Sequence, residues 1–237
     1  FALKPSPLQA TWAGYVNTTG LAQIDYFISG VFTTPLDMAP FFAEKLAYLP
    51  HSRFCYSPPG YSPYVTPVPS ESCYHISFGC FNNLAKLSDT TIAMWAEILS
   101  RVPKSKLILK RGALEDPQVR RMVRERFKQH GIAAHRLDLR GHSLHSFMLA
   151  EYGEVDIALD SMPFSGGLTS LEALWMGVPV ITLVGNTPAS RQTGSFLNLL
   201  GLCDLIAYDH TGYVETAVCL ARNPARLRQM RSEGLNE

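Results

Sequence analysis

The sequence predicts an α/β fold whose main part is a doubly wound parallel sheet over residues 74–237. Three observations predict it: six short apolar runs, stretches of helical apolar spacing between them, and glycines where several of these helices end. Strands that alternate with helices form parallel sheets through right-handed crossovers. The region is therefore expected to form a Rossmann-like domain.

The elements of this domain follow from the chain in order. The predicted strands are 75–81, 106–110, 136–140, 155–160, 178–184 and 205–208. The predicted helices are 90–101, 117–129, 145–152, 169–176, 190–200 and 213–221, and a further helix precedes Glu237. Pro117 suits a helix start, whereas Gly131, Gly177 and Gly201 stand just past helix ends.

A proline-rich stretch separates this domain from the N-terminal part. Residues 50–70 hold six prolines, which excludes a helix there and favours turns. We expect residues 1–55 to form the end of an N-terminal lobe and residues 56–73 to form a linker. Within that lobe, residues 8–14 alternate like a strand, and residues 36–46 have helical apolar spacing despite a proline at position 40.

The composition limits the function classes. Of the 237 residues 46% are hydrophobic and 17% charged, which excludes disorder as a description of the whole chain. The net charge is only +1, so nothing global indicates nucleic acid or a membrane as a partner. The five cysteines form no Cys-X-X-Cys motif, which argues against a disulfide framework or a zinc site and favours the cytoplasm. The chain lacks an initial Met, so we expect a fragment of a longer protein.

The candidate ligand-binding residues lie in two loops at the carboxyl ends of predicted strands, because ligands of such sheets bind at that edge. In the first, Gly166 and Gly167 precede Thr169 and Ser170 at a helix start. Glycines let the backbone approach phosphate, and a helix start offers free N–H groups and the positive dipole end. The same pattern also suits a tight turn with Thr169 as a helix cap.

The second loop, residues 81–88, places Lys86 at the same edge of the sheet as Thr169. A departing nucleoside diphosphate needs its charge neutralised, either by a metal on paired carboxylates or by cations and helix dipoles. No Asp-X-Asp triplet occurs, so the residues favour the solution without a metal. A lone loop lysine can equally belong to a solvated surface.

Two further candidates lie near the same edge. Glu172 follows in the helix after the glycines, where it can cap backbone N–H groups or accept a hydrogen bond from a ribose hydroxyl. His145 opens the helix after the third strand, where an imidazole can stack on a base or bind phosphate, although histidines near helix starts are often bystanders.

Several separate motifs resemble the catalytic region of the O-linked N-acetylglucosamine transferase family. The most extended is Gly-Gly-Leu-Thr-Ser-Leu-Glu-Ala-Leu-Trp-Met-Gly-Val-Pro-Val at 166–180, continued by Ala-Ser-Arg at 189–191. The others are 14–20, 24–26, 44–51, 81–86 and 95–103. Together they cover nearly the whole chain in the family's order.

This resemblance implies a GT-B glycosyltransferase, with two Rossmann-like lobes around the nucleotide sugar. It implies an inverting, metal-independent enzyme that moves N-acetylglucosamine or a hexose from a UDP-sugar to Ser or Thr of a protein acceptor, often behind tetratricopeptide repeats. No cofactor is expected besides the UDP-sugar donor.

The resemblance also implies roles for particular residues. Lys86 is expected to bind the diphosphate as the catalytic residue. The expected nucleotide-sugar-binding residues are Asn83, His145, Gly166, Gly167, Thr169, Ser170, Glu172, Thr18 and Thr19. Of these, Thr169 and Ser170 would bind the β-phosphate, Glu172 the ribose, and His145 the uracil or ribose. Thr18 and Thr19 would face the donor from the other lobe.

Two departures from the family leave alternatives open. Gly-Tyr-Val-Asn at 14–17 stands where relatives have Gly-Tyr-Pro-Gly, and Leu168 stands where many have Thr. One alternative is therefore a remnant that binds nucleotide sugar or a partner without catalysis. Another is a cytoplasmic N-glycosyltransferase that moves a hexose from UDP-glucose to Asn.

Overall fold

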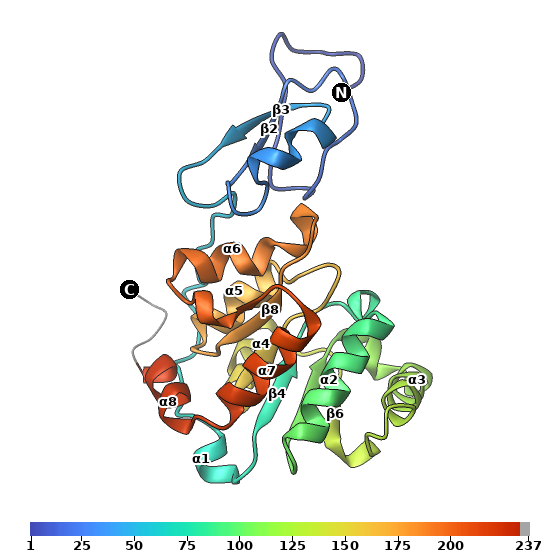
Figure 1. Ribbon diagram of the computed structural model, residues 1–237, viewed down its shortest axis with the longest axis vertical. Helices are drawn as coiled ribbons and strands as arrows, with labels where there is room; N and C mark the ends of the chain where they lie inside the picture. Colours follow the sequence, from blue (N-terminus) through green and yellow to red (C-terminus); the bar gives the residue numbers. More distant parts are fainter. Residues whose placement is uncertain (233–237) are drawn as a thin grey trace.

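The computed structural model describes residues 1–232, so the last five residues of the predicted domain, 233–237, lie outside the described residues. Two separate parallel sheets organise the chain (Figure 1). A three-stranded sheet lies in the N-terminal part, and a six-stranded sheet with helices around it forms the larger C-terminal part. The α/β fold that the sequence predicts is confirmed.

The six-stranded sheet has the order β6-β5-β4-β7-β8-β9, and all of its strand pairs are parallel. Its strands are β4 (Ser77–Cys80), β5 (Lys106–Lys110), β6 (Leu137–Arg140), β7 (Ile157–Leu159), β8 (Val180–Leu183) and β9 (Ile206–Ala207). Counted along the chain this is the order 3-2-1-4-5-6 of a doubly wound domain. The order reverses between β4 and β7, so a crevice is expected beyond the carboxyl ends of these two strands.

Helices connect the strands where the sequence predicts them. They are α2 (Asp89–Arg101), α3 (Pro117–Lys128), α4 (His145–Glu151), α5 (Leu168–Trp175), α6 (Gln192–Leu199) and α7 (His210–Ala221), followed by α8 (Pro224–Ser232). Pro117 is the first residue of α3. Gly177 has a φ of 71°, a conformation that ends α5 and that side chains with a Cβ rarely adopt.

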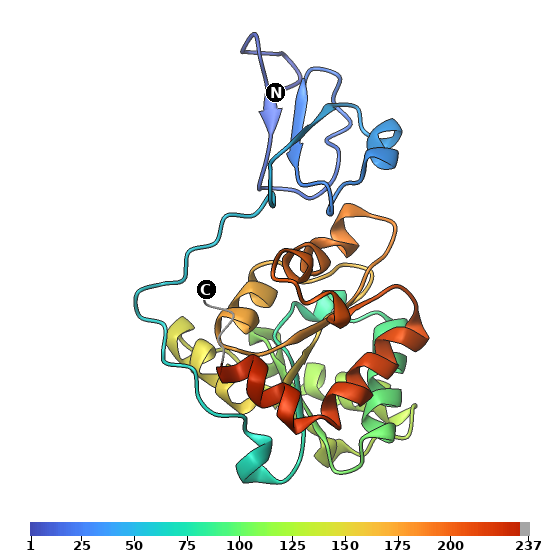
Figure 2. The ribbon, with the colours of Figure 1, turned by 60° about the vertical axis from the view of Figure 1, so that its left-hand side comes forward.

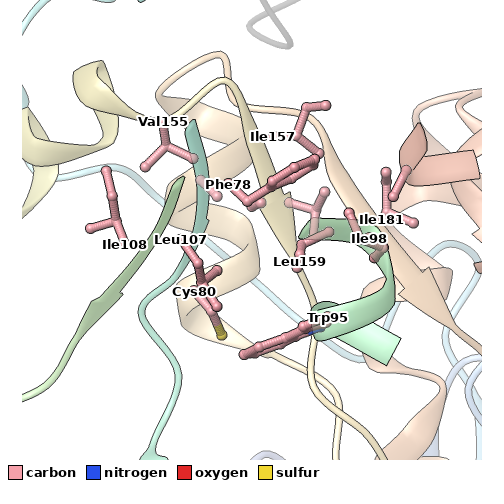
Figure 3. Close-up of a cluster of buried hydrophobic side chains, with 14 of the residues drawn as sticks. Phe78, Cys80, Trp95, Ile98, Leu107, Ile108, Val155, Ile157, Leu159 and Ile181 are labelled. Atoms are coloured by element: carbon pink, nitrogen blue, oxygen red, sulfur yellow. The ribbon is translucent and has the colours of Figure 1, made fainter. Parts of the chain in front are cut away.

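The core lies between the six-stranded sheet and its helices (Figure 3). Trp95 and Ile98 of α2 pack toward Phe78 of β4 and its neighbouring strands, and all three side chains are fully buried. The strands β4, β7, β8 and β9 are buried on both faces because helices cover both sides of a doubly wound sheet, whereas the edge strand β6 alternates buried and partly exposed residues. This packing fixes the strand ends from which the site loops emerge.

The N-terminal part corrects one expectation. Its parallel strands are β1 (Ala10–Thr11), β2 (Tyr26–Ser29) and β3 (Lys45–Tyr48), so the strand expected at 8–14 is shorter. The helix expected at 36–46 is wrong: residues 36–41 form a 3₁₀ turn, η1 (Leu36–Phe41), which contains Pro40, and the chain then continues into β3. Proline cannot donate a helical hydrogen bond, and pairing with β2 satisfies the backbone of β3 instead.

The segment expected to be the linker, residues 56–73, runs along the outside of the C-terminal part to the single turn α1 (Ser70–Cys73) (Figure 2). Near its end, buried Arg231 of α8 donates a hydrogen bond of 2.8 Å to the carbonyl oxygen of Thr66. Just before this segment, the rings of Phe54 and Phe196 meet edge to face with centres 4.9 Å apart. The linker is therefore held against the domain rather than free.

The two parts also meet beside α6. The Nε atom of Arg191 donates a hydrogen bond of 2.8 Å to the carbonyl oxygen of Phe32, and the Arg191 guanidinium lies 5.1 Å from the centre of the Phe32 ring. None of the helices within residues 1–232 is long and apolar enough to cross a membrane.

Candidate functional site

A cavity of about 690 Å³ opens at the carboxyl edge of the six-stranded sheet. Its walls come from the loops after β4, β5 and β6 and from the start of α5, and they include Asn83, Arg111, His145, Leu168, Thr169 and Glu172. A second hollow of about 770 Å³ reaches Ser77 and Lys106, which begin β4 and β5. The first cavity is the candidate site, because parallel sheets bind ligands at the carboxyl ends of their strands.

The glycine turn before α5 is held by the buried carboxylate of Asp160, which follows β7. One carboxylate oxygen accepts the Gly166 amide at 2.7 Å, and the other accepts the Thr182 hydroxyl at 2.8 Å. Burial raises the pKa of Asp160, while these donors favour the ionised form. A Cβ on Gly166 would overlap the Ser170 hydroxyl oxygen, which is why glycine suits this position of the turn.

The first turn of α5 leaves backbone amides available. Gly167 is the N-cap, and no side chain caps the helix. The amides of Ser170 and Leu171 both donate to the Gly167 carbonyl oxygen. Among residues 1–232, no acceptor pairs with the amides of Leu168 and Thr169. Free N–H groups at the positive end of a helix dipole form a site for an anion.

Lys86 lies at this same turn. It ends the short 3₁₀ helix η2 (Leu84–Lys86), and its ammonium donates a hydrogen bond of 2.8 Å to the Ser165 carbonyl oxygen. The ammonium also lies 4.2 Å from the centre of the Phe164 ring. Burial lowers the pKa of Lys86, and the nearby Asp160 carboxylate opposes that effect. The structure thus brings the predicted cation to the loop that leads into the predicted helix start.

The hydroxyls of Thr169 and Ser170 are already engaged. The Thr169 hydroxyl donates to the side-chain oxygen of Asn82 at 2.6 Å, and buried Ser170 is hydrogen-bonded to the Thr193 hydroxyl at 2.8 Å. The interpretation of Thr169 as the helix cap is wrong, because Gly167 holds that position. Thr169 thus ties α5 to the loop after β4 and Ser170 ties it to α6, which leaves the backbone amides of Leu168 and Thr169 without a partner among residues 1–232.

Asn82, which the sequence analysis did not single out, joins the two site loops. It is buried, and its amide donates to the Asp160 carboxylate at 3.2 Å while its oxygen accepts from Thr169. The predicted Asn83 is exposed, lines the cavity and accepts a hydrogen bond from the Ala85 amide. One feature of the sequence could have indicated Asn82: it lies two positions after the end of β4, and the strand order reverses beside that strand.

Glu172 and His145 meet inside the cavity. The His145 Nε2 atom lies 2.8 Å from a carboxylate oxygen of Glu172, and its Nδ1 atom lies 2.9 Å from the Tyr61 hydroxyl oxygen. Glu172 is buried, which raises its pKa, whereas the hydrogen bond from His145 lowers it. Glu172 makes no capping bond to the start of α5, so the capping interpretation is wrong. Tyr61, from the linker, is a second residue that sequence reasoning missed.

Thr18 and Thr19 are placed elsewhere. The buried carboxylate of Glu44 accepts the Thr18 hydroxyl at 2.6 Å, the Thr19 amide at 2.7 Å and the Thr19 hydroxyl. Neither threonine lines the cavity. Their role toward the donor stays a prediction.

No three His, Cys, Asp or Glu side chains of residues 1–232 come together in a way that could hold a metal ion.

Two parallel α/β sheets in one chain, the second of them doubly wound, are the architecture of the GT-B glycosyltransferases. At the level of family, residues 1–57 and 68–236 match the profile of glycosyl transferase family 41. The chain belongs to this family.

Relatives and solved structures agree with this assignment. The chain is 39% identical over 232 residues to a probable UDP-N-acetylglucosamine–peptide N-acetylglucosaminyltransferase, SPINDLY, of Solanum lycopersicum, covering 97% of the chain and 25% of the relative. It is 32% identical to the probable transferase SEC of Arabidopsis thaliana, over 98% of the chain and 24% of the relative. The chain therefore spans about a quarter of the length of these relatives.

Among solved structures, a mutant O-GlcNAc transferase of Thermobaculum terrenum superposes with a TM-score of 0.91 at 35% identity. The match covers 98% of this chain and 44% of that chain. The resemblance that the sequence motifs indicate is thus confirmed for both family and fold.

Proposed function

We propose that this chain binds the UDP part of a UDP-sugar, and that the whole protein transfers N-acetylglucosamine from it to Ser or Thr of a protein acceptor. The observation that carries the proposal is the position of Lys86, whose ammonium contacts the Ser165 carbonyl oxygen at the turn before the free amides of α5. The names of the relatives, which describe transfer from UDP-N-acetylglucosamine to peptide, support the choice of donor and acceptor.

The proposed reaction is one in-line displacement with inversion. The acceptor oxygen forms a bond to the anomeric carbon and gives its proton to a base, while the bond from that carbon to the diphosphate oxygen breaks. The diphosphate leaves with the electron pair. Its growing negative charge meets the Lys86 ammonium and the amides of Leu168 and Thr169, groups that are in place before the reaction. This chain thus offers the leaving group a fixed cation and a helix start.

The nucleoside half of the donor fits the cavity beside this helix. The second carboxylate oxygen of Glu172 accepts no hydrogen bond from residues 1–232, so it can accept one from a ribose hydroxyl. His145, which holds the first oxygen, lies at the place proposed for the uracil or ribose. We retain Asn83, Thr18 and Thr19 as proposed contacts. We place the reaction in the cytoplasm, because all five cysteines are free thiols and a reducing compartment keeps them so.

The test is transfer by the whole protein from labelled UDP-N-acetylglucosamine and, separately, from labelled UDP-glucose, with the modified side chain mapped by mass spectrometry. We expect transfer of N-acetylglucosamine to Ser or Thr. Transfer of glucose to Asn would overturn the proposal in favour of N-glycosylation. Binding of UDP with no transfer to any protein would overturn it in favour of a non-catalytic binding protein.

A further inference from the structure

The linker reaches into the candidate site through one phenol. The Tyr61 hydroxyl oxygen lies 2.9 Å from Nδ1 of His145, and the two rings meet edge to face at 87° with centres 5.8 Å apart. The other ring nitrogen of His145 lies 2.8 Å from the Glu172 carboxylate. Residues of the linker, α4 and α5 therefore form one continuous hydrogen-bonded chain.

For a neutral His145 ring beside an ionised Glu172, the chemistry of these groups fixes the direction of the hydrogen bonds. An ionised carboxylate only accepts, so Nε2 of His145 carries the proton that it donates to Glu172. In a neutral imidazole the other nitrogen is then an acceptor, and the Tyr61 hydroxyl donates to it. The Glu172 carboxylate thereby selects the tautomer, and the Tyr61 hydroxyl holds the second ring nitrogen, so the orientation of the ring is fixed from both sides.

The orientation of the His145 ring affects the proposed ligand contact through Glu172. Its carboxylate is buried, and the hydrogen bond from His145 holds one of its oxygens. The orientation that leaves the other oxygen for a ligand hydroxyl depends on that bond. Loss of the Tyr61 hydroxyl leaves Nδ1 of His145 without its donor, so the ring keeps only one of the two hydrogen bonds that fix its orientation.

We infer that Tyr61 is a positioning residue for the nucleoside half of the donor, acting through His145 on Glu172. The inference rests on the proposed function, since it takes a ribose hydroxyl as the ligand of Glu172. It also gives the linker a task besides connecting the two lobes, because the linker supplies the outermost group of the hydrogen-bonded chain.

A conservative variant tests this role. Tyr61→Phe keeps the ring and removes only the hydroxyl, and Tyr61 is 59% exposed, so the core is not disturbed. We expect calorimetry on the whole protein to give UDP affinity lower by roughly 3- to 10-fold, the usual worth of one hydrogen bond. Tyr64→Phe is the matched control, because Tyr64 lies on the same linker and is 96% exposed. It should bind UDP like the wild type.

A double-mutant cycle separates positioning from direct contact. In a His145→Gln background, the further change Tyr61→Phe should not alter UDP affinity, because Tyr61 acts only through His145. A loss of the same size in both backgrounds would assign Tyr61 a direct ligand contact and overturn the positioning role. Equal UDP binding by wild type and Tyr61→Phe would overturn the inference and leave the proposed function intact.

A spectroscopic measurement does not depend on ligand. Selective ¹⁵N-histidine labelling should give a His145 signal of the tautomer protonated at Nε2, identified by its loss in His145→Gln. We expect the Nδ1 resonance of His145 to shift in Tyr61→Phe and not in Tyr64→Phe; an unchanged resonance would contradict the inference. A wild type that shows this tautomer but binds no UDP would instead overturn the proposed function, and the inference with it.

Discussion

The Lys86 ammonium lies 2.8 Å from the Ser165 carbonyl oxygen, although the two residues are 79 positions apart in the chain. They meet because β4 and β7 are neighbours in the sheet, so the loops that follow these strands share one edge. The loop after β7 leads directly into α5 and its free amides. A cation and a helix start therefore converge where a doubly wound sheet binds its ligand.

Replacement of this cation should affect the chemical step. In Lys86→Ala of the whole protein we expect the rate of sugar transfer to fall by roughly 10²-fold or more, because a preorganised charge on the leaving group is lost. Lys128→Ala is the control, since Lys128 is a surface residue of α3 whose side chain is 74% exposed. Steady-state kinetics with UDP-N-acetylglucosamine measure the effect, and wild-type turnover by Lys86→Ala would remove Lys86 from the mechanism.

The two neighbouring asparagines should behave differently. Asn82→Ala leaves the Thr169 hydroxyl without its acceptor and removes one of the donors to the buried Asp160 carboxylate, so we expect the free energy of unfolding to fall by about 1–3 kcal/mol. Asn83→Ala removes an exposed cap of a short turn and should cost less, about 0.5–1 kcal/mol. Urea unfolding of both variants compares them. An equal cost, or a larger one for Asn83→Ala, would contradict the role of Asn82 in joining the loops.

The glycine turn should tolerate no side chain. A Cβ at position 166 would clash with the Ser170 hydroxyl oxygen and lie 3.3 Å from the Asn82 amide, so Gly166→Ala is expected to destabilise by about 1–3 kcal/mol. Gly60→Ala provides the control, because no atom lies within 4 Å of a Cβ built there. Thermal unfolding measures both variants, and the account of this turn fails if Gly166→Ala unfolds at the temperature of Gly60→Ala.

The Glu44 carboxylate should give a defined pH dependence. Burial acts to raise its pKa, but donors from Thr18 and Thr19 outweigh burial, so its pKa is lowered from 4.5. Between the lowered value and 4.5 the unfolded chain binds more protons than the folded one, so the stability from this group is full above 4.5 and is lost as the pH falls. We expect Glu44→Gln to cost about 1–2 kcal/mol at neutral pH and less in acid, where Glu44 itself is protonated.

Urea unfolding across this pH range checks the Glu44 prediction. Glu125→Gln serves as the control, because Glu125 is 58% exposed and its nearest cation, on Lys128, is 3.6 Å away. A cost for Glu44→Gln that does not change with pH, or one that grows in acid, would show that the threonine donors do not stabilise the ionised form.

The domain fold was predictable because its strands are short apolar runs and several of the helices between them carry local signals. The run at Lys106–Lys110 and the proline that begins α3 are examples. The N-terminal part was not predictable in the same way. The apolar spacing of residues 36–46 resembles that of a helix. Residues Lys45–Tyr48 are a strand only because they pair with β2, a contact that the local pattern does not reveal.

The site residues also fall into two groups, those predictable from local pattern and those that depend on contacts distant in the chain. Lys86 and the start of α5 follow from strand order and local pattern, because both lie in loops after strands. The partners of Glu172 and Thr169 do not, since Tyr61 and Asn82 reach them from elements far away in sequence. The linker looked like a spacer in the sequence, and only the folded structure places its phenol on His145.

A crystal structure of the whole protein with bound UDP tests the central claim most directly. We predict that the Lys86 ammonium, still beside the Ser165 carbonyl oxygen, and the amides of Leu168 and Thr169 lie within hydrogen-bond distance of the same diphosphate. A diphosphate bound away from the start of α5, or one whose oxygens Lys86 does not contact, would contradict the account.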